Sequence, residues 1–397
     1  MPCQRMEVSR RISGLTGGGS DGWDIYRKAR DLKAAGVDVV ELTIGEHDRR
    51  TEPEILDAMH ASARGGHTGY AALPGTDELR DAVAKRVSER TGVATSRDNV
   101  VVTPGGQSAL FAAHIAACDP GDRALYIDPY YATYPGTIRG TGAVAVAVQA
   151  RAERGFQPDV ADIAAVADGA ASLLINSPNN PTGAVYSRET LEGIAGLCRE
   201  RNLWLISDEV YDTQVWDGQH VSPRQLPGMA ARTLVIGSLS KSHAMTGSRL
   251  GWIVGPAEAI NHLSNLSTHT TYGVPGFIQD AGLFALDRGT DLENRIAEPF
   301  RRRHKAVQEL LIRRGLPFVP SAGTMYLMLD IRATGRSGEA FAHRLLDEHQ
   351  IAVMPGESFG KAAAGHLRVA LTVEDARLMT AIGILADLYG KLTEAAA

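Results

Sequence analysis

The sequence predicts an α/β protein with a large domain built on a mostly parallel, doubly wound sheet and a smaller α+β domain. Three observations support this fold class: short, wholly apolar runs rich in β-branched residues, helix-like segments between them, and a change of pattern in the last third of the chain. Strands that helices cover on both faces of a parallel sheet are apolar throughout rather than alternating.

The predicted strands of the large domain follow one another between residues 100 and 237. They are VVVT (100–103), ALYID (124–128), AVAVAV (143–148), SLLIN (172–176), LWLIS (203–207) and TLVIG (233–237). Helices are predicted over residues 77–90 and 188–201, where apolar residues recur at helical spacing. The alternation of the two types of element predicts helices on both faces of the sheet.

The C-terminal part of the chain has a different pattern. A long charged helix is predicted over residues 291–314, with Arg301, Arg302, Arg303 and Lys305 on its solvated face. Two strands, MYLML (325–329) and LRVAL (367–371), flank a helix predicted over residues 338–349.

These patterns predict three segments. Residues 1–45 form an N-terminal arm and part of the small domain, residues 46–290 form the large domain, and residues 291–397 form the rest of the small domain.

Composition excludes several classes of protein. The 397-residue chain has 41 Lys and Arg against 46 Asp and Glu, a formal net charge of −5, which argues against nucleic acid as a main partner. No run of about 20 apolar residues is present to cross a membrane. The three cysteines, Cys3, Cys118 and Cys198, match neither a disulfide framework nor a metal site. The N-terminus lacks the apolar core of a secretory signal, so we expect a reducing, cytoplasmic location.

Ligands of open α/β sheets bind beyond the carboxyl ends of the strands, so the segments after each apolar run are the places to look. PGGQSALF (104–111) follows the first strand, and its glycines let backbone N–H groups approach an anion at a helix N-terminus. SPNNPTG (177–183) follows another strand and offers amide donors held by two prolines. Each turn alone is also compatible with an ordinary loop.

Charged side chains follow the next two strands. In DEVYD (208–212), Asp208 is either a helix N-cap or a site carboxylate, and surface charges are one interpretation of Glu209 and Asp212. In SLSKSHAMTGSRLGW (238–252), Lys241 lies among hydroxyl residues and eight positions before Arg249. An anion turn, rigid amides, a carboxylate and an amine beside hydroxyls together suit pyridoxal 5′-phosphate, an aromatic cation with a phosphate and an aldehyde.

These segments resemble the class I/II aminotransferases, the fold-type I pyridoxal-phosphate enzymes. The resemblance extends from LTIGEHD (42–48) to LRVAL (367–371), and its most specific parts are NNPTG, SDEVYD and SLSKSHAMTGSRLGW. It implies a homodimer with shared active sites, in which Tyr70 of GYAALPGTDELR (69–80) reaches the phosphate of the neighbouring subunit.

The resemblance also implies which residues hold the cofactor. Lys241 would form the Schiff base, Asp208 would bond the pyridine nitrogen, and Asn180 and Tyr211 would bond the phenolic oxygen. Tyr131 would stack on the ring. The phosphate would be held by the backbone around Gly106 and Gln107 and by Ser238, Ser240 and Arg249.

For the substrate, the resemblance implies that Arg368 grips the α-carboxylate, helped by Asn180 and the backbone at Gly45. A planar guanidinium binds a carboxylate bidentately, which lysine cannot do. Lys241 would act as the base once substrate displaces it, because a buried amine beside cations has a lowered pKa.

The sequence departs from the family pattern at a few positions. Gln107 stands where a branch that prefers aspartate has a lysine for the distal carboxylate, which places a strict dicarboxylate preference in question. His47 replaces a frequent proline, Ser248 replaces a bulkier residue, and Tyr131 replaces tryptophan or phenylalanine.

The leading hypothesis is a ping-pong aminotransferase of amino-acid metabolism that moves an α-amino group from an L-amino acid to a 2-oxo acid, with aspartate- and aromatic-type substrates as candidates. A carbon–sulfur β-lyase on the same scaffold is the alternative, because a carbanion at Cα also expels a β-leaving group. A cofactor-binding sensor module of a transcriptional regulator is a distant third, since the resemblance begins at residue 42 and the net charge is negative.

Overall fold

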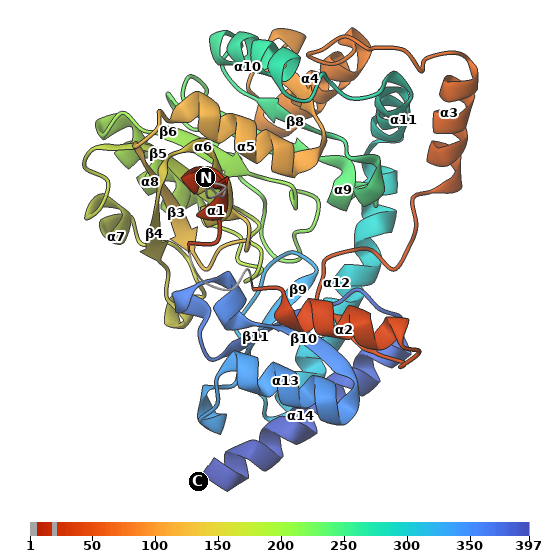
Figure 1. Cartoon of the computed structure of the whole chain (residues 1–397), viewed down its shortest axis with the longest axis vertical. Coiled ribbons are helices and arrows are strands. Elements are labelled where there is room, and N and C mark those ends of the chain that lie inside the picture. Colours follow the sequence, from red (N-terminus) through yellow and green to blue (C-terminus); the bar gives the residue numbers. More distant parts are fainter. Residues whose placement is uncertain (1–5, 18–21, 397) are drawn as a thin grey trace, which may run out of the picture.

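The computed structural model describes residues 6–17 and 22–396, which form two sheets surrounded by helices (Figure 1). The larger sheet has seven strands in the order β2-β8-β7-β6-β5-β3-β4, and the smaller has four in the order β1-β10-β11-β9. The predicted fold class is confirmed: α/β, with a mostly parallel sheet and many helices.

All six apolar runs are strands of the seven-stranded sheet. The strands are β2 (Val100–Thr103), β3 (Arg123–Asp128), β4 (Val144–Gln149), β5 (Ala170–Asn176), β6 (Trp204–Asp208), β7 (Thr233–Ser238) and β8 (Gly251–Val254). β3 to β7 pair in parallel, whereas β8, which sequence analysis did not predict, lies antiparallel between β7 and β2. β4 is an edge strand of this sheet, and its Val144 is 49% exposed.

Helices pack on both faces of the other strands. Adjacent residues of β6 point to opposite faces: Ile206 packs in the cluster that includes α5 (Gly105–Ala117) and α6 (Tyr134–Thr141), and Leu205 in the cluster that includes α8 (Arg188–Glu200). The remaining helices of this part are α3 (Pro53–Arg64), α4 (Asp77–Thr91), α7 (Val160–Ala164), α9 (Leu239–Ser242), α10 (Ala257–His269) and α11 (Gly276–Asp287).

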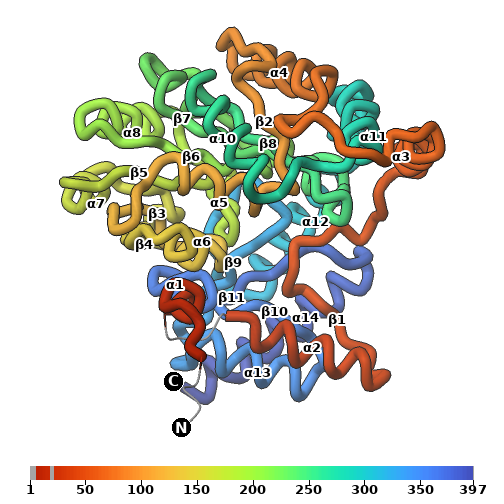
Figure 2. The backbone as a smooth tube through the Cα atoms, turned by 45° about the horizontal axis from the view of Figure 1, so that its top comes forward, coloured from red at the N-terminus to blue at the C-terminus, as the bar shows by residue number. Residues whose placement is uncertain are grey.

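The four-stranded sheet joins the two ends of the chain. β9 (Tyr326–Asp330) and β11 (His366–Ala370) correspond to the predicted strands, and β10 (Ile351–Pro355) and β1 (Val40–Leu42) were not predicted. β1 pairs in parallel with β10. The helices α2 (Asp24–Ala34), α13 (Gly338–His349) and α14 (Asp375–Ala396) pack around this sheet (Figure 2). The short helix α1 (Arg10–Ser13) precedes them, and the division at residues 45 and 290 stays a prediction.

The long helix α12 (Gly289–Arg314) runs from the seven-stranded part to the four-stranded part (Figures 1 and 2). Arg301, Arg302 and Lys305 are exposed as expected, but the prediction for Arg303 is wrong, because it is 6% exposed. Its guanidinium binds Asp48 and Asp375 and donates to the Leu371 carbonyl.

In the described part of the chain, we find no helix with the length and apolarity needed to cross a membrane.

Candidate active site

The carboxyl ends of β5, β6 and β7 lie side by side and bring the predicted site residues together. In the sheet register Asn176 pairs with Asp208, and Asp208 with Ile236. A cavity of about 330 Å³ opens at this edge. Its lining includes every predicted site residue except Tyr70: Gly45, Gly106, Gln107, Tyr131, Asn180, Asp208, Tyr211, Ser238, Ser240, Lys241, Arg249 and Arg368.

One end of the cavity is lined by hydrogen-bond donors suited to an anion. The helix α5 begins at Gly105, which has a φ of +77°; a Cβ there would overlap the guanidinium of Arg249. The N-terminal N–H groups of α5 are therefore next to the arginine and to Ser238 and Ser240, whose hydroxyls are 2.9 Å apart.

Lys241 reaches the cavity from α9, a single turn that Ser238 caps by accepting the N–H of Ser240 at 3.0 Å. The Lys241 Nζ donates to the carbonyl oxygen of Gly45. Burial lowers the pKa of Lys241, and the nearby cations Arg368 and Arg249 lower it further, while Tyr326 and Glu46 act in the opposite direction. The lysine is therefore a buried amine with a reduced affinity for its proton.

Asp208 lies at the bottom of the cavity and is 4% exposed. Its Oδ2 accepts the Tyr134 hydroxyl at 2.6 Å, and its Oδ1 accepts the N–H of Val210 at 3.3 Å. No helix begins at the described residues directly after it, so the N-cap interpretation is not realised. Burial raises the pKa of Asp208 to about 6, although the Tyr134 hydrogen bond opposes that shift. Within the described chain this carboxylate has no cationic partner.

The two other carboxylates of this segment are not surface charges, so that interpretation is wrong. Glu209 is 7% exposed and binds His220 at 3.0 Å, and Asp212 binds Arg86 at 2.7 Å. Arg86 also binds Glu293 of α12 at 2.9 Å. The two ion pairs of Arg86 link the segment that carries Asp208 and Tyr211 to α4 and α12.

Arg368 lies on β11 and is 1% exposed. Its Nη1 donates to Asn180 Oδ1 at 2.9 Å, and its Nη2 donates to the Thr43 carbonyl. The guanidinium lies 4.4 Å from the ring centre of Tyr326 and 4.3 Å from that of Phe359. Its Nε has no partner among the described residues. The arginine is held as a fixed, partly unsatisfied cation at the wall of the cavity.

Sequence analysis missed two tyrosines that line the cavity. Tyr326 lies in the apolar run of β9, and its hydroxyl is 3.0 Å from that of Tyr211. Tyr134 contacts Asp208, as described above. For Tyr326, its place inside an apolar run was the available signal, because a buried hydroxyl needs a hydrogen-bond partner.

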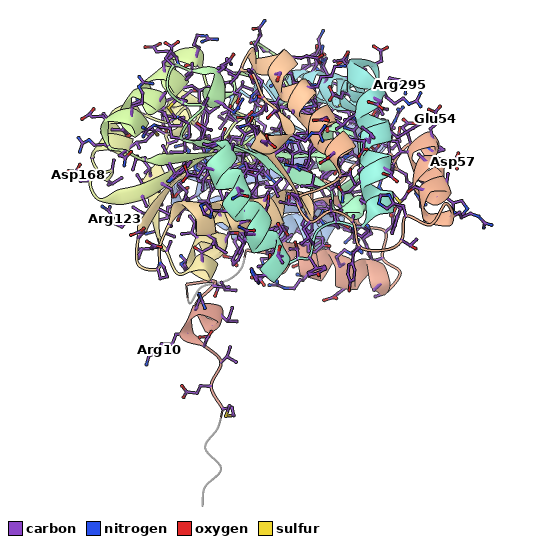
Figure 3. All side chains as sticks on the ribbon, turned by 90° about the horizontal axis from the view of Figure 1, so that it is seen from above. Arg10, Glu54, Asp57, Arg123, Asp168 and Arg295 are labelled. Carbon is purple, nitrogen blue, oxygen red and sulfur yellow. The ribbon has the colours of Figure 1, made fainter. Side chains whose placement is uncertain are left out.

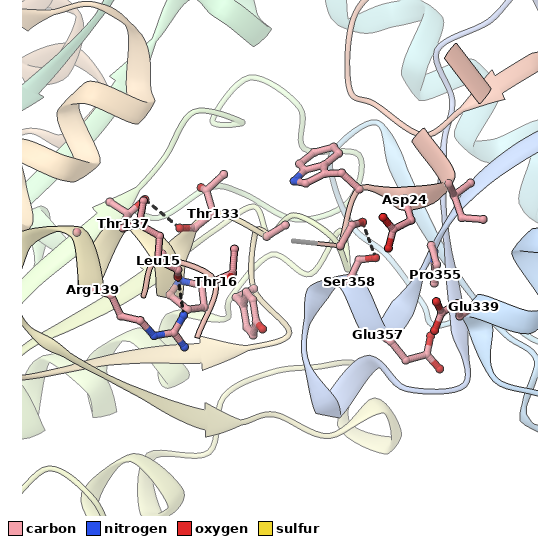
Figure 4. Close-up of a pocket in the computed structure, with 18 of the residues that line it drawn as sticks. Leu15, Thr16, Asp24, Thr133, Thr137, Arg139, Glu339, Pro355, Glu357 and Ser358 are labelled. Atoms are coloured by element: carbon pink, nitrogen blue, oxygen red, sulfur yellow. Dashed lines mark hydrogen bonds between the residues drawn. The ribbon is translucent and has the colours of Figure 1, made fainter. Parts of the chain in front are cut away.

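Both polar atoms of the Gln107 side chain form hydrogen bonds to nearby threonines. Its Nε2 donates to Thr137 at 2.7 Å, and its Oε1 accepts from Thr133 at 2.9 Å. Both threonines line a second cavity of about 650 Å³, which shares Trp23 with the first; Figure 4 shows them opposite Ser358.

Tyr70 does not reach this cavity. Its side chain is 89% exposed and packs edge-to-face on Tyr272, with ring centres 5.0 Å apart.

The fold and this site together define a pyridoxal-phosphate-dependent aminotransferase. The chain matches the family Aminotransferase class I and II over residues 37–385, and it belongs to that family.

Related proteins are transaminases with different substrates in their names. The chain is 42% identical over 370 residues to the arginine–pyruvate transaminase AruH of Pseudomonas aeruginosa, covering 93% of this chain and 94% of that protein. It is 35% identical over 371 residues to the aspartate/prephenate aminotransferase of Thermus thermophilus, with coverages of 92% and 95%. The solved structure of the Thermus thermophilus aspartate aminotransferase with maleate has a TM-score of 0.91 at 34% identity, covering 97% of this chain and 100% of that one.

The residues present fit pyridoxal 5′-phosphate. The buried carboxylate of Asp208 lacks a cation, which a protonated pyridine nitrogen supplies. The N-terminus of α5 at Gly106 and Gln107 lines the same cavity, as does an amine with a lowered pKa.

Proposed function

We propose that this chain carries out ping-pong transamination through Lys241. The observation that supports this most directly is that the Lys241 amine shares one cavity with the unpaired carboxylate of Asp208 and the guanidinium of Arg368. These are the groups needed at the aldehyde, the ring nitrogen and the substrate carboxylate.

The proposed cofactor contacts divide the cavity into regions. The α5 N-terminus at Gly106 and Gln107, with Ser238, Ser240 and Arg249, holds the phosphate. Asp208 holds the ring nitrogen, Asn180 and Tyr211 bond the phenolic oxygen, and Tyr131 covers the ring. When bound, pyridoxal phosphate supplies an aldehyde that accepts the amino group and a cationic ring that withdraws electrons from the substrate Cα.

Lys241 is the proposed proton carrier. Its lowered pKa provides a neutral amine at lower pH than a solvated lysine does, and this amine moves the proton between the substrate Cα and the cofactor C4′. Arg368 and Asn180, with the backbone at Gly45, would hold the substrate by its α-carboxylate in the cavity that Lys241 also lines.

We further propose that the preferred amino acid has a neutral or basic side chain. The cationic side chains of the cavity are Lys241, Arg249 and Arg368, and each has a role toward the cofactor or the α-carboxylate. Gln107, which is neutral and bonded to two threonines, leaves a distal carboxylate without a cation in this chain. AruH is named for arginine and pyruvate, and this pair is therefore the first to test.

Replacement of the lysine tests the proposal. Lys241→Ala should lose turnover and the visible absorption of the bound cofactor, and borohydride reduction followed by peptide mapping should label Lys241 in the wild type. A half-reaction screen with arginine, phenylalanine and aspartate should favour the first two. An active Lys241→Ala protein would contradict the mechanism, and pyruvate and ammonia release from cystathionine without an acceptor would support the β-lyase instead.

We propose that two copies of this chain form a homodimer with shared active sites. We also propose that each chain is divided into domains at residues 45 and 290. Tyr70 is 89% exposed and does not line the cavity of its own chain, and α1, with Arg10, projects from the body of the chain (Figure 3) and contacts α6. Met6 and Val8 on this arm are 94% and 67% exposed, and a second copy of the chain would cover them.

We also propose a reducing, cytoplasmic location, which the free, buried thiols of Cys118 and Cys198 support. Cys3 lies outside the described residues.

Hybrid dimers test the shared site. Subunit exchange between inactive Lys241→Ala and impaired Tyr70→Ala proteins should raise activity above that of either, because one site of the hybrid then has both residues. A protein that light scattering shows to be an active monomer would contradict this proposal.

A further inference from the structure

Tyr134 contacts Asp208 and Tyr131, two residues proposed to hold the cofactor, although neither the sequence analysis nor the proposed function gives Tyr134 a role. It is the first residue of α6, is 3% exposed and donates its hydroxyl to Asp208 Oδ2 at 2.6 Å. This distance is at the short end for an O–H donor and matches a charge-assisted bond to a carboxylate.

The ring of Tyr134 also fixes the neighbouring aromatic residue. It lies edge-to-face against Tyr131, with ring centres 5.8 Å apart and planes at 86°. The N–H of Tyr134 donates to the Tyr131 carbonyl at 2.9 Å, which closes the turn between them. One buried side chain therefore links the carboxylate proposed for the ring nitrogen to the aromatic residue proposed to cover the ring.

We propose that Tyr134 is a positioning residue for the cofactor ring, which acts by orienting Asp208 and keeping it ionised. This inference rests on the role proposed above for Asp208. The hydroxyl occupies Oδ2, and Oδ1, which has only the longer 3.3 Å bond from Val210, stays available for the ring nitrogen. A carboxylate has about four lone-pair sites, so the two bonds leave capacity for a third.

The ionisation of Asp208 depends on its surroundings, which come from several elements. The titratable and charged groups around it are Tyr134 and Tyr131, Glu209 and Tyr211 of its own segment, and, across the cavity, Glu46, Lys241, Arg249, Tyr326 and Arg368. Burial raises the pKa of Asp208, and the hydroxyl of Tyr134 is the side-chain donor that lowers it. Loss of this donor should raise the pKa further, so a larger fraction of the carboxyl is neutral at a given pH.

The first test is Tyr134→Phe, which removes the hydroxyl and keeps the ring. We expect pyridoxal 5′-phosphate, measured by equilibrium dialysis, to bind about 10–100-fold more weakly, as for a lost hydrogen bond to a charged group. The matched control is Tyr126→Phe, a buried tyrosine of the same hydrophobic cluster, which should bind the cofactor as the wild type does. The melting temperature of each cofactor-free protein checks that both variants fold.

The pH profile separates positioning from a merely structural role. Cofactor affinity should fall on the acid side as Asp208 takes up a proton, and in Tyr134→Phe this fall should begin at higher pH. In an Asp208→Asn background, Tyr134→Phe should change the affinity less than threefold, because the tyrosine acts through the carboxylate.

Three results would overturn the inference. The first is a Tyr134→Phe protein that binds the cofactor with wild-type affinity. The second is a fall in affinity that begins at the same pH in Tyr134→Phe as in the wild type. The third is an equal loss of affinity on Tyr134→Phe substitution in the wild-type and Asp208→Asn backgrounds. Failure of the wild-type protein to bind pyridoxal 5′-phosphate would instead overturn the proposed function, and this inference with it.

Discussion

Arg368 lies between two aromatic rings with one nitrogen unpaired, so the plane of its guanidinium is fixed before substrate arrives. Arg368→Lys keeps the charge but loses the planar fork, and we expect the KM for the amino acid to rise about 10–100-fold, the cost of a lost charged hydrogen bond. Affinity for the cofactor should change little. Arg377→Lys, at an exposed position, is the control. Equal losses of substrate and cofactor affinity in Arg368→Lys would argue against the assigned role.

The sequence predicted the positions of single site residues where a motif fixes the local backbone. The turns after β2, β5, β6 and β7 place their side chains at one sheet edge, as predicted. Tyr134 and Tyr326 could not be assigned in this way, because their roles depend on contacts with Asp208 and Tyr211, far away in the sequence. The roles of the predicted site residues stay predictions until variants are measured.

Among the elements, clear boundaries decided which strands the sequence could predict. The six apolar runs that became strands are separated by helical or polar segments, whereas β1 has three residues and includes Glu41. β8 follows the lysine loop directly, and β10 follows α13 after Gln350, so neither has a clear boundary of its own. The place of AVAVAV at the edge of the sheet could not be predicted, because position in a sheet is set by tertiary pairing.

Arg303 shows how a helix pattern misleads when charges pair. It lies among charged residues of α12, yet its side chain is 7% exposed and binds Asp48 and Asp375. Arg303→Met should lower the free energy of unfolding by about 1–3 kcal/mol, since Asp48 loses its partner and the Leu371 carbonyl its donor. Lys305→Met, exposed on the same helix, should change it by about 0.5 kcal/mol or less. Equal effects in urea unfolding would mean that the buried pairs contribute nothing.

For the whole molecule, buried histidines set the acid limit of stability. Burial lowers the pKa of His47 to about 3 and the pKa values of His114, His243 and His304 to about 4. The unfolded chain protonates these four histidines near pH 6.5, so at these positions it binds more protons than the folded chain between pH 6.5 and 4. Asp208 and Asp128, whose pKa burial raises to about 6, act in the opposite direction but are fewer. Stability should therefore fall as the pH falls through this window, by up to about 1.4 kcal/mol per pH unit for each histidine.

Calorimetry of the cofactor-free protein between pH 7 and 4.5 checks this prediction. The melting temperature should decrease steadily, and His114→Gln should make the decrease shallower. A constant melting temperature over this range would contradict the proposed neutrality of these side chains.

The pairing of β1 with β10 determines the order in which the chain can complete its fold. Val40 is opposite Ile351, so a ribosome must synthesise most of the protein before the first strand meets its neighbour. The seven-stranded sheet, whose strands all lie between residues 100 and 254, has no such requirement. The nascent chain can therefore assemble its larger sheet while the segment at residues 40–42 waits for the C-terminal strands to emerge.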